Sequence, residues 1–174
     1  LTIICFFFYY LLGMSAFDSL IHCMTTISTG GFSNHSLSFA YFNSFSLEIN
    51  SVIFMVMGSL PFVIFIQFFH GHKISIFKDD QIKLFLLLLI LIIFMTSIWL
   101  SNYMNIEFDQ ALRLSIFNIT SILTGTGYTS SNYNNWGGFG LMIILMIMFI
   151  GGCAGSTTGG IKIFRFQILF RGLK

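Results

Sequence analysis

Long, uncharged and largely apolar stretches alternate with short charged ones along the sequence. The uncharged stretches cover residues 1–17, 19–47, 49–72, 84–106 and 114–161. Because a transmembrane helix needs about 20 consecutive apolar residues, the pattern predicts one span over Ile49–Phe69 and another over Ile82–Leu100. Pro61 is expected to kink the first of these. Leu1–Met14 resembles the end of a further span, as in an internal fragment.

The two remaining stretches, 19–47 and 114–161, are too polar to be ordinary spans. Each is interrupted by Ser, Thr, Asn and Gly residues, which continue a helix poorly. Irregular backbone at membrane depth is tolerated only where it is buried in protein or lines a watery cavity. The stretches therefore predict two re-entrant loops. Their central residues are Ser28, Thr29, Gly30, Gly31 and Phe32 in the first loop, and Thr124, Gly125, Thr126, Gly127 and Tyr128 in the second.

The two loops belong to an internal repeat. Placing Gly31 on Gly127 shifts the sequence by 96 residues, since 127 − 31 = 96. Without a gap, this shift also aligns Ser19 with Ser115, His22 with Asn118, Thr25 with Ser121, Ser28 with Thr124 and Phe32 with Tyr128. Each copy is predicted to run as a span, a short amphipathic helix, a Gly-rich loop and a second span. Because two spans separate the loops, both loops enter from the same face of the membrane.

Local chemistry predicts where the short helices begin. Ser15 followed by Asp18 is a capping-box pattern, and Asp109 lies early in the second short helix, where an anion complements the positive end of the helix dipole. The alternative interpretation is that Ser15 and Asp18 merely cap an interfacial helix. Because the repeat places a Gly-rich loop after each short helix, the C-terminal ends of both helices are predicted to point at the loops. The partial negative charge of a helix C-terminus favours a cation at the loops.

Composition places the chain in a membrane. Charged residues make up 8% of the sequence, against about 25% in globular proteins, and the mean hydropathy is +0.88. This excludes an ordinary water-soluble domain. A net charge of +2 gives no basic field for nucleic acid. Cys5, Cys23 and Cys153 are scattered without CxxC spacing, which favours buried thiols over a disulfide framework or a zinc site.

The basic residues predict the orientation of the chain. Seven of the eight Lys and Arg residues lie in the 73–83 connection or in the tail, namely Lys73, Lys78, Lys83, Lys162, Arg165, Arg171 and Lys174. By the positive-inside rule, both regions are cytoplasmic, and the two Gly-rich loops face the outside. Arg113 is then the lone cation on the outer side. Trp99 and Trp136 are predicted to anchor the spans at the membrane interfaces.

The loops have the chemistry of a cation filter. Rings of backbone carbonyls can replace the water shell of an ion, and glycine brings such carbonyls close to a narrow axis. The string from Thr124 to Tyr128 offers carbonyls, hydroxyls and an aromatic side chain without a charge. Taken alone, it would also fit an ordinary Gly/Thr turn. Its place in an uncharged stretch, with a second copy in register, favours the filter.

The last predicted span is interrupted. Five of the ten residues from Gly151 to Gly160 are glycines, and each interior glycine costs a helix about 1 kcal/mol relative to alanine, so the helix should break there. The interrupting residues are Gly151, Gly152, Cys153, Ala154, Gly155, Ser156, Thr157, Thr158, Gly159 and Gly160. Close helix packing through small residues is the alternative interpretation. The spacing matches neither a phosphate-binding P-loop nor a nucleophile elbow, so no enzyme is predicted.

Four segments resemble the TrkH/KtrB family of bacterial potassium uptake proteins, part of the Trk/Ktr/HKT superfamily. They are Thr25–Ser33 (TTISTGGFS), the connection His70–Lys83, Thr124–Tyr128 (TGTGY) and, most specifically, Phe149–Lys162 (FIGGCAGSTTGGIK). The resemblance implies an all-α polytopic membrane protein of the bacterial inner (plasma) membrane. Its span, pore-helix, filter-loop, span units would number four around one ion path, with about two present here.

By this resemblance, residues 1–70 would hold the end of the first helix, the pore loop and the last helix of repeat two. Residues 71–83 would be a cytoplasmic connection, and residues 84–174 would form repeat three. Gly31 and Gly127 would be the filter glycines, and residues 151–160 would form a gating loop within the membrane. K⁺ would be the transported ion, and no bound cofactor is implied. The expected partners are the lipid bilayer, a second subunit in a homodimer, and a cytosolic nucleotide-binding regulatory subunit of the TrkA/KtrA kind.

Two other functions stay open from the sequence. The small-residue loops could be packing interfaces in a membrane scaffold that transports nothing. The broken helices could also hold an organic solute in a secondary transporter, although the loops offer no charge for one. Coupling of K⁺ movement to sodium or proton symport is a further open question.

Overall fold

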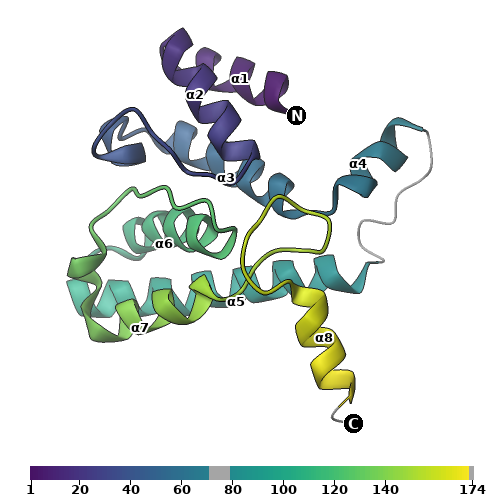
Figure 1. Cartoon of the computed structure of the whole chain (residues 1–174). Coiled ribbons are helices and arrows are strands. Elements are labelled where there is room, and N and C mark those ends of the chain that lie inside the picture. Colours follow the sequence, from purple (N-terminus) through teal and green to yellow (C-terminus); the bar gives the residue numbers. More distant parts are fainter. Residues whose placement is uncertain (71–78, 173–174) are drawn as a thin grey trace.

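The structure is a computed structural model that describes residues 1–70 and 79–172 (Figure 1). The elements, in chain order, are α1 (Thr2–Leu11), α2 (Ala16–Ile27), η1 (Ser38–Tyr41), α3 (Phe45–Ser59), α4 (Phe62–Phe69), α5 (Asp80–Met104), α6 (Phe108–Leu123), η3 (Tyr133–Trp136), α7 (Gly137–Met148) and α8 (Ile163–Gly172). Lys73, Lys78, Lys174 and most of the predicted 71–83 connection lie outside the described residues.

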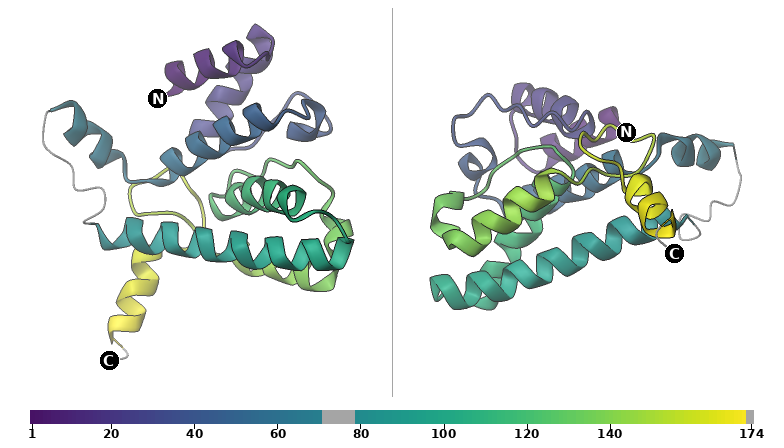
Figure 2. Two further views of the ribbon diagram at one scale, coloured as in Figure 1. Left: turned by 180° about the vertical axis from the view of Figure 1, so that it is seen from behind. Right: turned by 60° about the horizontal axis from the view of Figure 1, so that its bottom comes forward.

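The helices form two units of the same kind. In the first unit, the short helix α2 lies between α1 and α3; in the second, α6 packs between α5 and α7 (Figures 1 and 2). The two units meet where α3 packs against α6. Both halves of the chain therefore run in the order helix, short helix, loop and helix, as the predicted repeat requires.

The short helices start and stop where local chemistry predicts. Ser15 is the N-cap of α2, because its hydroxyl accepts a hydrogen bond from the Asp18 N–H at 3.1 Å. Asp109 lies in the first turn of α6, as expected for an anion near the positive end of the helix dipole. The helices end at Ile27 and Leu123, which differ by the repeat shift of 96 residues.

Each unit has its own apolar core. The core of the second unit joins α5, α6 and α7 through fully buried side chains such as Phe85, Leu100 and Leu123. The core of the first unit joins α1, α2 and α3, and it also takes in Phe117 and Tyr128 from the second unit. These two side chains pack the units together. All three cysteines are buried free thiols, as the sequence predicts.

One described helix, α5, is long and apolar enough by itself to cross a membrane, with 25 residues. The predicted single span over Ile49–Phe69 is wrong in its continuity, because the helix stops at Ser59 and resumes at Phe62 as α4. Pro61 causes the break. It supplies no backbone N–H for a helix, and it holds Leu60 in an extended conformation at φ −84° and ψ 156°.

A buried ion pair joins the two units. The Arg113 guanidinium on α6 donates to both carboxylate oxygens of Glu48 on α3, with Nε–Oε2 at 2.7 Å and Nη2–Oε1 at 2.8 Å. Glu48 is 4% exposed.

Trp136 does not have the exposed place at the membrane interface that the sequence predicts. It is 1% exposed and packs in the core of the second unit. The Trp99 indole N–H donates to the Trp136 carbonyl at 3.0 Å.

We expect Glu48→Gln to lower the free energy of unfolding by about 1–3 kcal/mol, because an amide has one acceptor oxygen for the two guanidinium donors and leaves the other unpaired. The Arg113 side chain is 33% exposed, and solvent screening keeps the effect below that of a fully buried pair. Thermal unfolding of the purified full-length protein in detergent measures this. Lys83→Gln, which breaks an exposed pair with Asp80, is the control and should change little. Equal effects of the two substitutions would contradict the assignment.

Candidate functional site

The two Gly-rich loops have the same backbone course. The residue after each helix, Ser28 or Thr124, is still helical, with φ and ψ of −75° and −5° in the first and −78° and −8° in the second. Thr29 and Gly31 then adopt positive φ, at 52° and 64°; the corresponding Gly125 and Gly127 do the same, at 71° and 88°. The repeat predicted from sequence is thus also a repeat of backbone conformation.

The same hydrogen bonds fold both loops. In the first loop, the Thr25 hydroxyl donates to the Phe32 carbonyl at 2.9 Å, and in the second the Ser121 hydroxyl donates to the Tyr128 carbonyl at 2.7 Å. Each of these hydroxyls belongs to the last turns of its short helix. The N–H groups of Gly31 and Gly127 likewise return to the carbonyls of Thr25 and Ser121. The C-terminal end of each short helix is therefore tied to its loop.

The two loops touch at Gly31. A Cβ atom built on Gly31 would lie 1.8 Å from the carbonyl oxygen of Thr126, so only glycine fits there. The same construction on Gly127 meets nothing within 4 Å. Thr126 is buried, and its hydroxyl shares a hydrogen bond with that of Thr124 at 2.8 Å. The backbones of two predicted filter segments thus approach each other, and no charged side chain lies in either segment.

Tyr128 braces its loop against the other unit. Its buried hydroxyl lies 2.6 Å from the Thr25 hydroxyl and 3.2 Å from that of Thr26, both on α2. The Thr26 hydroxyl is in turn bonded to Tyr9 on α1 at 2.9 Å. Phe32, the counterpart of Tyr128, is 75% exposed instead. Among the described residues, no short helix lies beside Phe32 as α2 lies beside Tyr128.

His22 and Asn118 hold the chain that leaves each loop. Both are fully buried on the short helices. The His22 Nε2 atom lies 3.0 Å from the Ser33 hydroxyl, and the Asn118 amide donates to the Ser130 hydroxyl at 2.8 Å while its oxygen accepts from the Ser130 N–H at 3.1 Å. The two equivalent positions are therefore polar groups packed inside the bundle.

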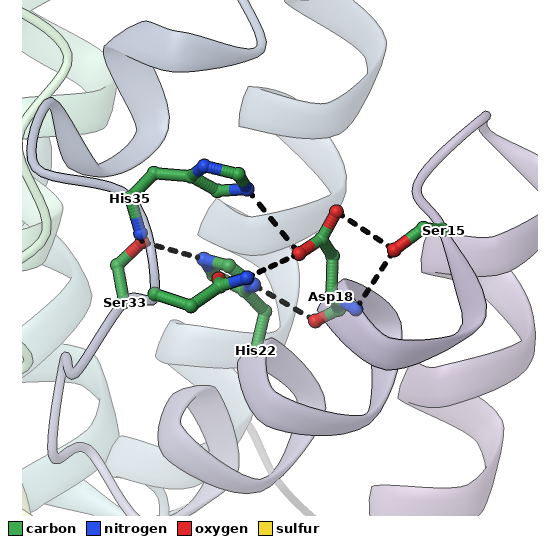
Figure 3. Close-up of polar contacts among 6 residues, drawn as sticks. Ser15, Asp18, His22, Ser33 and His35 are labelled. Atoms are coloured by element: carbon green, nitrogen blue, oxygen red, sulfur yellow. Dashed lines mark hydrogen bonds and ion pairs between the residues drawn. The ribbon is translucent and has the colours of Figure 1, made fainter.

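Around α2, this arrangement extends to a polar cluster at the start of the helix (Figure 3). The Asp18 carboxylate contacts the Ser15 hydroxyl at 2.8 Å, the His35 Nε2 atom at 3.2 Å and the side-chain amide of Asn34. The His35 ring stacks on Tyr41 with centroids 3.7 Å apart. The hydrogen bond from Asn34, assisted by those from Ser15 and His35, lowers the pKa of the Asp18 carboxyl. The cluster fixes the segment after the loop onto the start of the short helix.

The glycine-rich segment after α7 breaks the helix, as the sequence predicts. α7 ends at Met148 and α8 begins at Ile163. Between them the chain makes a loop whose two ends meet, because the Ile161 N–H donates to the Phe149 carbonyl and the Gly151 N–H donates to the Ile161 carbonyl, both at 2.9 Å. The 151–160 loop therefore begins and ends at nearly the same place, between the end of α7 and the start of α8 (Figure 1).

This loop docks on the break at Pro61. The N–H groups of Cys153 and Thr157 donate to the carbonyls of Ser59 and Gly58, at 3.1 and 3.3 Å, and the Gly155 carbonyl accepts from the Phe62 N–H at 3.0 Å. In addition, the Thr157 hydroxyl lies 3.0 Å from the carbonyl of Ile27, the last residue of α2. The loop also reaches α5, where Gln81 accepts from the Ala154 N–H at 3.1 Å. These contacts were not predicted from sequence; Pro61 was the one signal for them.

The 151–160 loop also lies next to the second filter segment. A Cβ atom built on Gly125 would be 3.6 Å from the Gly159 nitrogen. Gly125, Gly127, Gly159 and Gly160 line one cavity of about 550 Å³. The structure therefore brings together all three glycine-rich segments singled out from sequence, with the 151–160 loop touching the end of α2 on one side and the second loop on the other.

Two short helices that each lead into a Gly-rich loop, together with a helix broken by a third glycine-rich loop, are typical of all-helical membrane proteins of the channel and transporter type. Comparison with known proteins gives the family. The sequence profile of the TrkH cation transport protein family matches residues 1–174, and the chain belongs to that family. Because this is a family of cation transport proteins, the prediction that the chain is not an enzyme is confirmed.

Several relatives of known sequence or structure are similar to the chain. The Trk system potassium uptake protein TrkI of Halomonas elongata is 42% identical over 92% of this chain and 32% of its own length. TrkH of Vibrio parahaemolyticus is 34% identical over 97% of this chain and 36% of its length. The crystal structure of the potassium transporter TrkH from Vibrio parahaemolyticus superposes with a TM-score of 0.93 at 31% identity, over 99% of this chain and 39% of that one. The chain thus spans about a third of the length of these relatives.

Gly31→Ala and Gly127→Ala should differ although both glycines have positive φ. Gly127→Ala adds only backbone strain of about 1–2 kcal/mol, because the space beside it is open. Gly31→Ala should cost clearly more, since its methyl group would strike the Thr126 carbonyl and push the loops apart. Unfolding midpoints of the purified full-length variants measure the difference. Equal losses would show that the loops do not pack as described.

The Asp18 cluster should make stability depend on pH. The pKa of the carboxyl is lower in the folded than in the unfolded chain, so its contribution is present above the unfolded value of about 3.9 and is lost as pH falls through the folded value. At pH 7, Asp18→Asn should lower stability by about 0.5–1 kcal/mol, since it removes an anion at the start of α2. The gap should close in acid. A gap that stays constant with pH would contradict this role.

Proposed function

We propose that this chain forms part of a K⁺ pathway, in which the ion passes the backbone carbonyls of residues 28–32 and 124–128. The observation that carries the proposal is the meeting of two equivalent loops at Gly31 and Thr126, since a filter requires carbonyls from several segments at one axis. The relatives support K⁺ as the ion, because they are named potassium uptake proteins. The loops contain no charge that would bind an ion too tightly to release it.

The short helices add to the attraction of a cation. α2 and α6 end at Ile27 and Leu123, directly before the loops, and a helix C-terminus carries about half a negative charge. Hydroxyls of Thr25 and Ser121 fix the loops to these ends at 2.9 and 2.7 Å. In this proposal, the helix dipoles compensate part of the hydration that K⁺ loses. A membrane potential of 100 mV then supplies about 2.3 kcal/mol per charge for inward movement.

The 151–160 loop is the proposed gate. It is held by three backbone hydrogen bonds at the Pro61 break and by the Thr157 hydroxyl at the end of α2, and it touches the second filter segment at Gly125. Apart from the buried Cys153, its side chains are small or polar, so most of the contacts that hold it are hydrogen bonds that can be exchanged. Movement of the loop away from Gly125 would open the way past the filter.

The remaining elements of the proposal concern the whole protein. It would contain four such repeats, of which residues 1–70 and 84–174 supply parts of two, joined by the 71–83 connection. It would lie in the bacterial inner membrane, with the filter loops outside and the connection and tail in the cytoplasm. It would act as a homodimer with a cytosolic nucleotide-binding subunit of the TrkA/KtrA kind. The near-complete superposition on the TrkH structure supports the repeat arrangement.

Gly127→Asp tests the filter. The full-length protein is expressed in a bacterium that lacks potassium uptake, and growth at limiting K⁺ is measured. The variant should abolish rescue, because a carboxylate would occupy the open space beside the second loop and trap a cation there. Gly31→Asp should do the same.

Gly13→Asp is the matched control. Gly13 also has positive φ and open space around it, but it lies in the turn between α1 and α2, away from both loops. It should retain rescue. If Gly127→Asp reaches the membrane in normal amounts and still restores growth, the loops are packing elements, and the scaffold interpretation replaces the filter.

A further inference from the structure

The side chain of Lys162 turns back into the 151–160 loop. Its ammonium group donates to the Thr158 carbonyl, to the Thr158 hydroxyl at 2.9 Å and to the Ser156 hydroxyl at 3.3 Å. The residue is half-buried. Among the described residues, no carboxylate lies within 4.0 Å of this ammonium group. A positive charge is thus held by three neutral oxygens of one loop.

These oxygens are themselves built into the loop. The Thr158 hydroxyl is buried and also lies 2.9 Å from the Gly152 N–H and 2.8 Å from the Ser156 hydroxyl. The Ser156 hydroxyl contacts the Cys153 carbonyl at 2.6 Å. Lys162 therefore connects the end of the loop to its beginning and middle. Without the ammonium group, the Thr158 carbonyl would lose its charged hydrogen-bond donor. The loop would also lose the hydrogen bonds that join Lys162 at its end to Ser156 and Thr158 in its middle.

Three other basic residues among those that the structure describes have a different environment. Arg113 pairs with Glu48, while Lys83 and Arg171 pair with Asp80 at the surface. Lys162 was predicted from sequence to mark the cytoplasmic side together with its neighbours in the tail. Its structural environment instead resembles a cation site, because carbonyl and hydroxyl oxygens are the ligands that replace water around a monovalent ion.

The 151–160 loop, which holds the Lys162 ammonium group, lies beside the second filter segment. Gly159 follows Thr158 directly and approaches Gly125 of the second filter segment. Gly159 and Gly160 line the same cavity as Gly125 and Gly127. In the proposed pathway, a cation that leaves the filter on this side would meet a like charge held by the loop. Two like charges that approach within about 10 Å in protein repel by an amount worth about tenfold in occupancy.

We propose that Lys162 is a tethered cation that holds the 151–160 loop in its closed form and excludes K⁺ from the oxygens of Ser156 and Thr158. Opening requires the ammonium group to leave these oxygens, after which a permeating ion can use them. This inference rests on the proposed function and names the residue that regulates its gate.

The test uses the full-length protein in lipid vesicles, with K⁺ efflux measured in the absence of any regulatory subunit. Lys162→Gln should raise basal K⁺ flux by about tenfold or more, because it removes the charge and keeps a hydrogen-bonding side chain. The ratio of K⁺ to Na⁺ flux should stay at the wild-type value, since the filter segments are unchanged. Arg165→Gln, which removes the next positive charge along the chain, is the matched control and should leave the basal flux unchanged.

Thr158→Val gives an independent measurement if Lys162→Gln does not reach a folded state. It keeps the charge and removes the hydroxyl that binds Lys162, so the basal flux should rise in the same direction by a smaller factor. Flux in Lys162→Gln or Thr158→Val at or below the wild-type level, with protein of normal stability, would overturn the tethered-cation role. Absence of K⁺ flux from wild type and every variant would instead overturn the proposed function itself.

Discussion

The requirement that every backbone group away from water be hydrogen-bonded organises this structure. Pro61 and residues 149–162 are two breaks in the helical path that lie far apart in sequence, and each break leaves N–H and C=O groups without helical partners. The free N–H and C=O groups of the two breaks form hydrogen bonds with each other. Carbonyls of Gly58 and Ser59 accept from the 151–160 loop, and that loop returns a carbonyl to the Phe62 N–H. Pro61 would destabilise an isolated helix, but these hydrogen bonds allow it to be tolerated here.

The same constraint explains the loops after α2 and α6. Their carbonyls cannot all bond within a helix, so hydroxyls of Thr25 and Ser121 fold each loop back onto its helix end. In the proposed filter, the loop carbonyls that these hydrogen bonds leave free would face the ion. Lys162 follows the same rule. Its ammonium group donates a hydrogen bond to the Thr158 carbonyl, which lies in a loop outside regular secondary structure.

The sequence predicted much of this arrangement. The repeat, the cap at Ser15, the buried cysteines and the break after α7 are all present. The predicted continuity of Ile49–Phe69 was wrong, because Pro61 breaks the helix and does not merely kink it. Trp136 is buried in the core and does not serve as the predicted anchor, because hydrophobicity does not distinguish a lipid-facing residue from one buried against protein. Arg113 and Glu48 were visible as lone charges in apolar surroundings, but their pairing required knowledge of which helices meet.

The sequence by itself determined the helical segments, the duplicated Gly-rich loops and the break after α7, because capping, helix propensity and the absence of charge act within a few residues. Only the tertiary structure decided that the two loops meet at Gly31 and Thr126, that the 151–160 loop closes the break at Pro61, and that Lys162 points into that loop. The first two of these contacts join residues about a hundred positions apart. They depend on the packing of one repeat against the other, and no local pattern encodes that packing. The direction of the Lys162 side chain is set by the fold of the loop, which the sequence pattern does not specify.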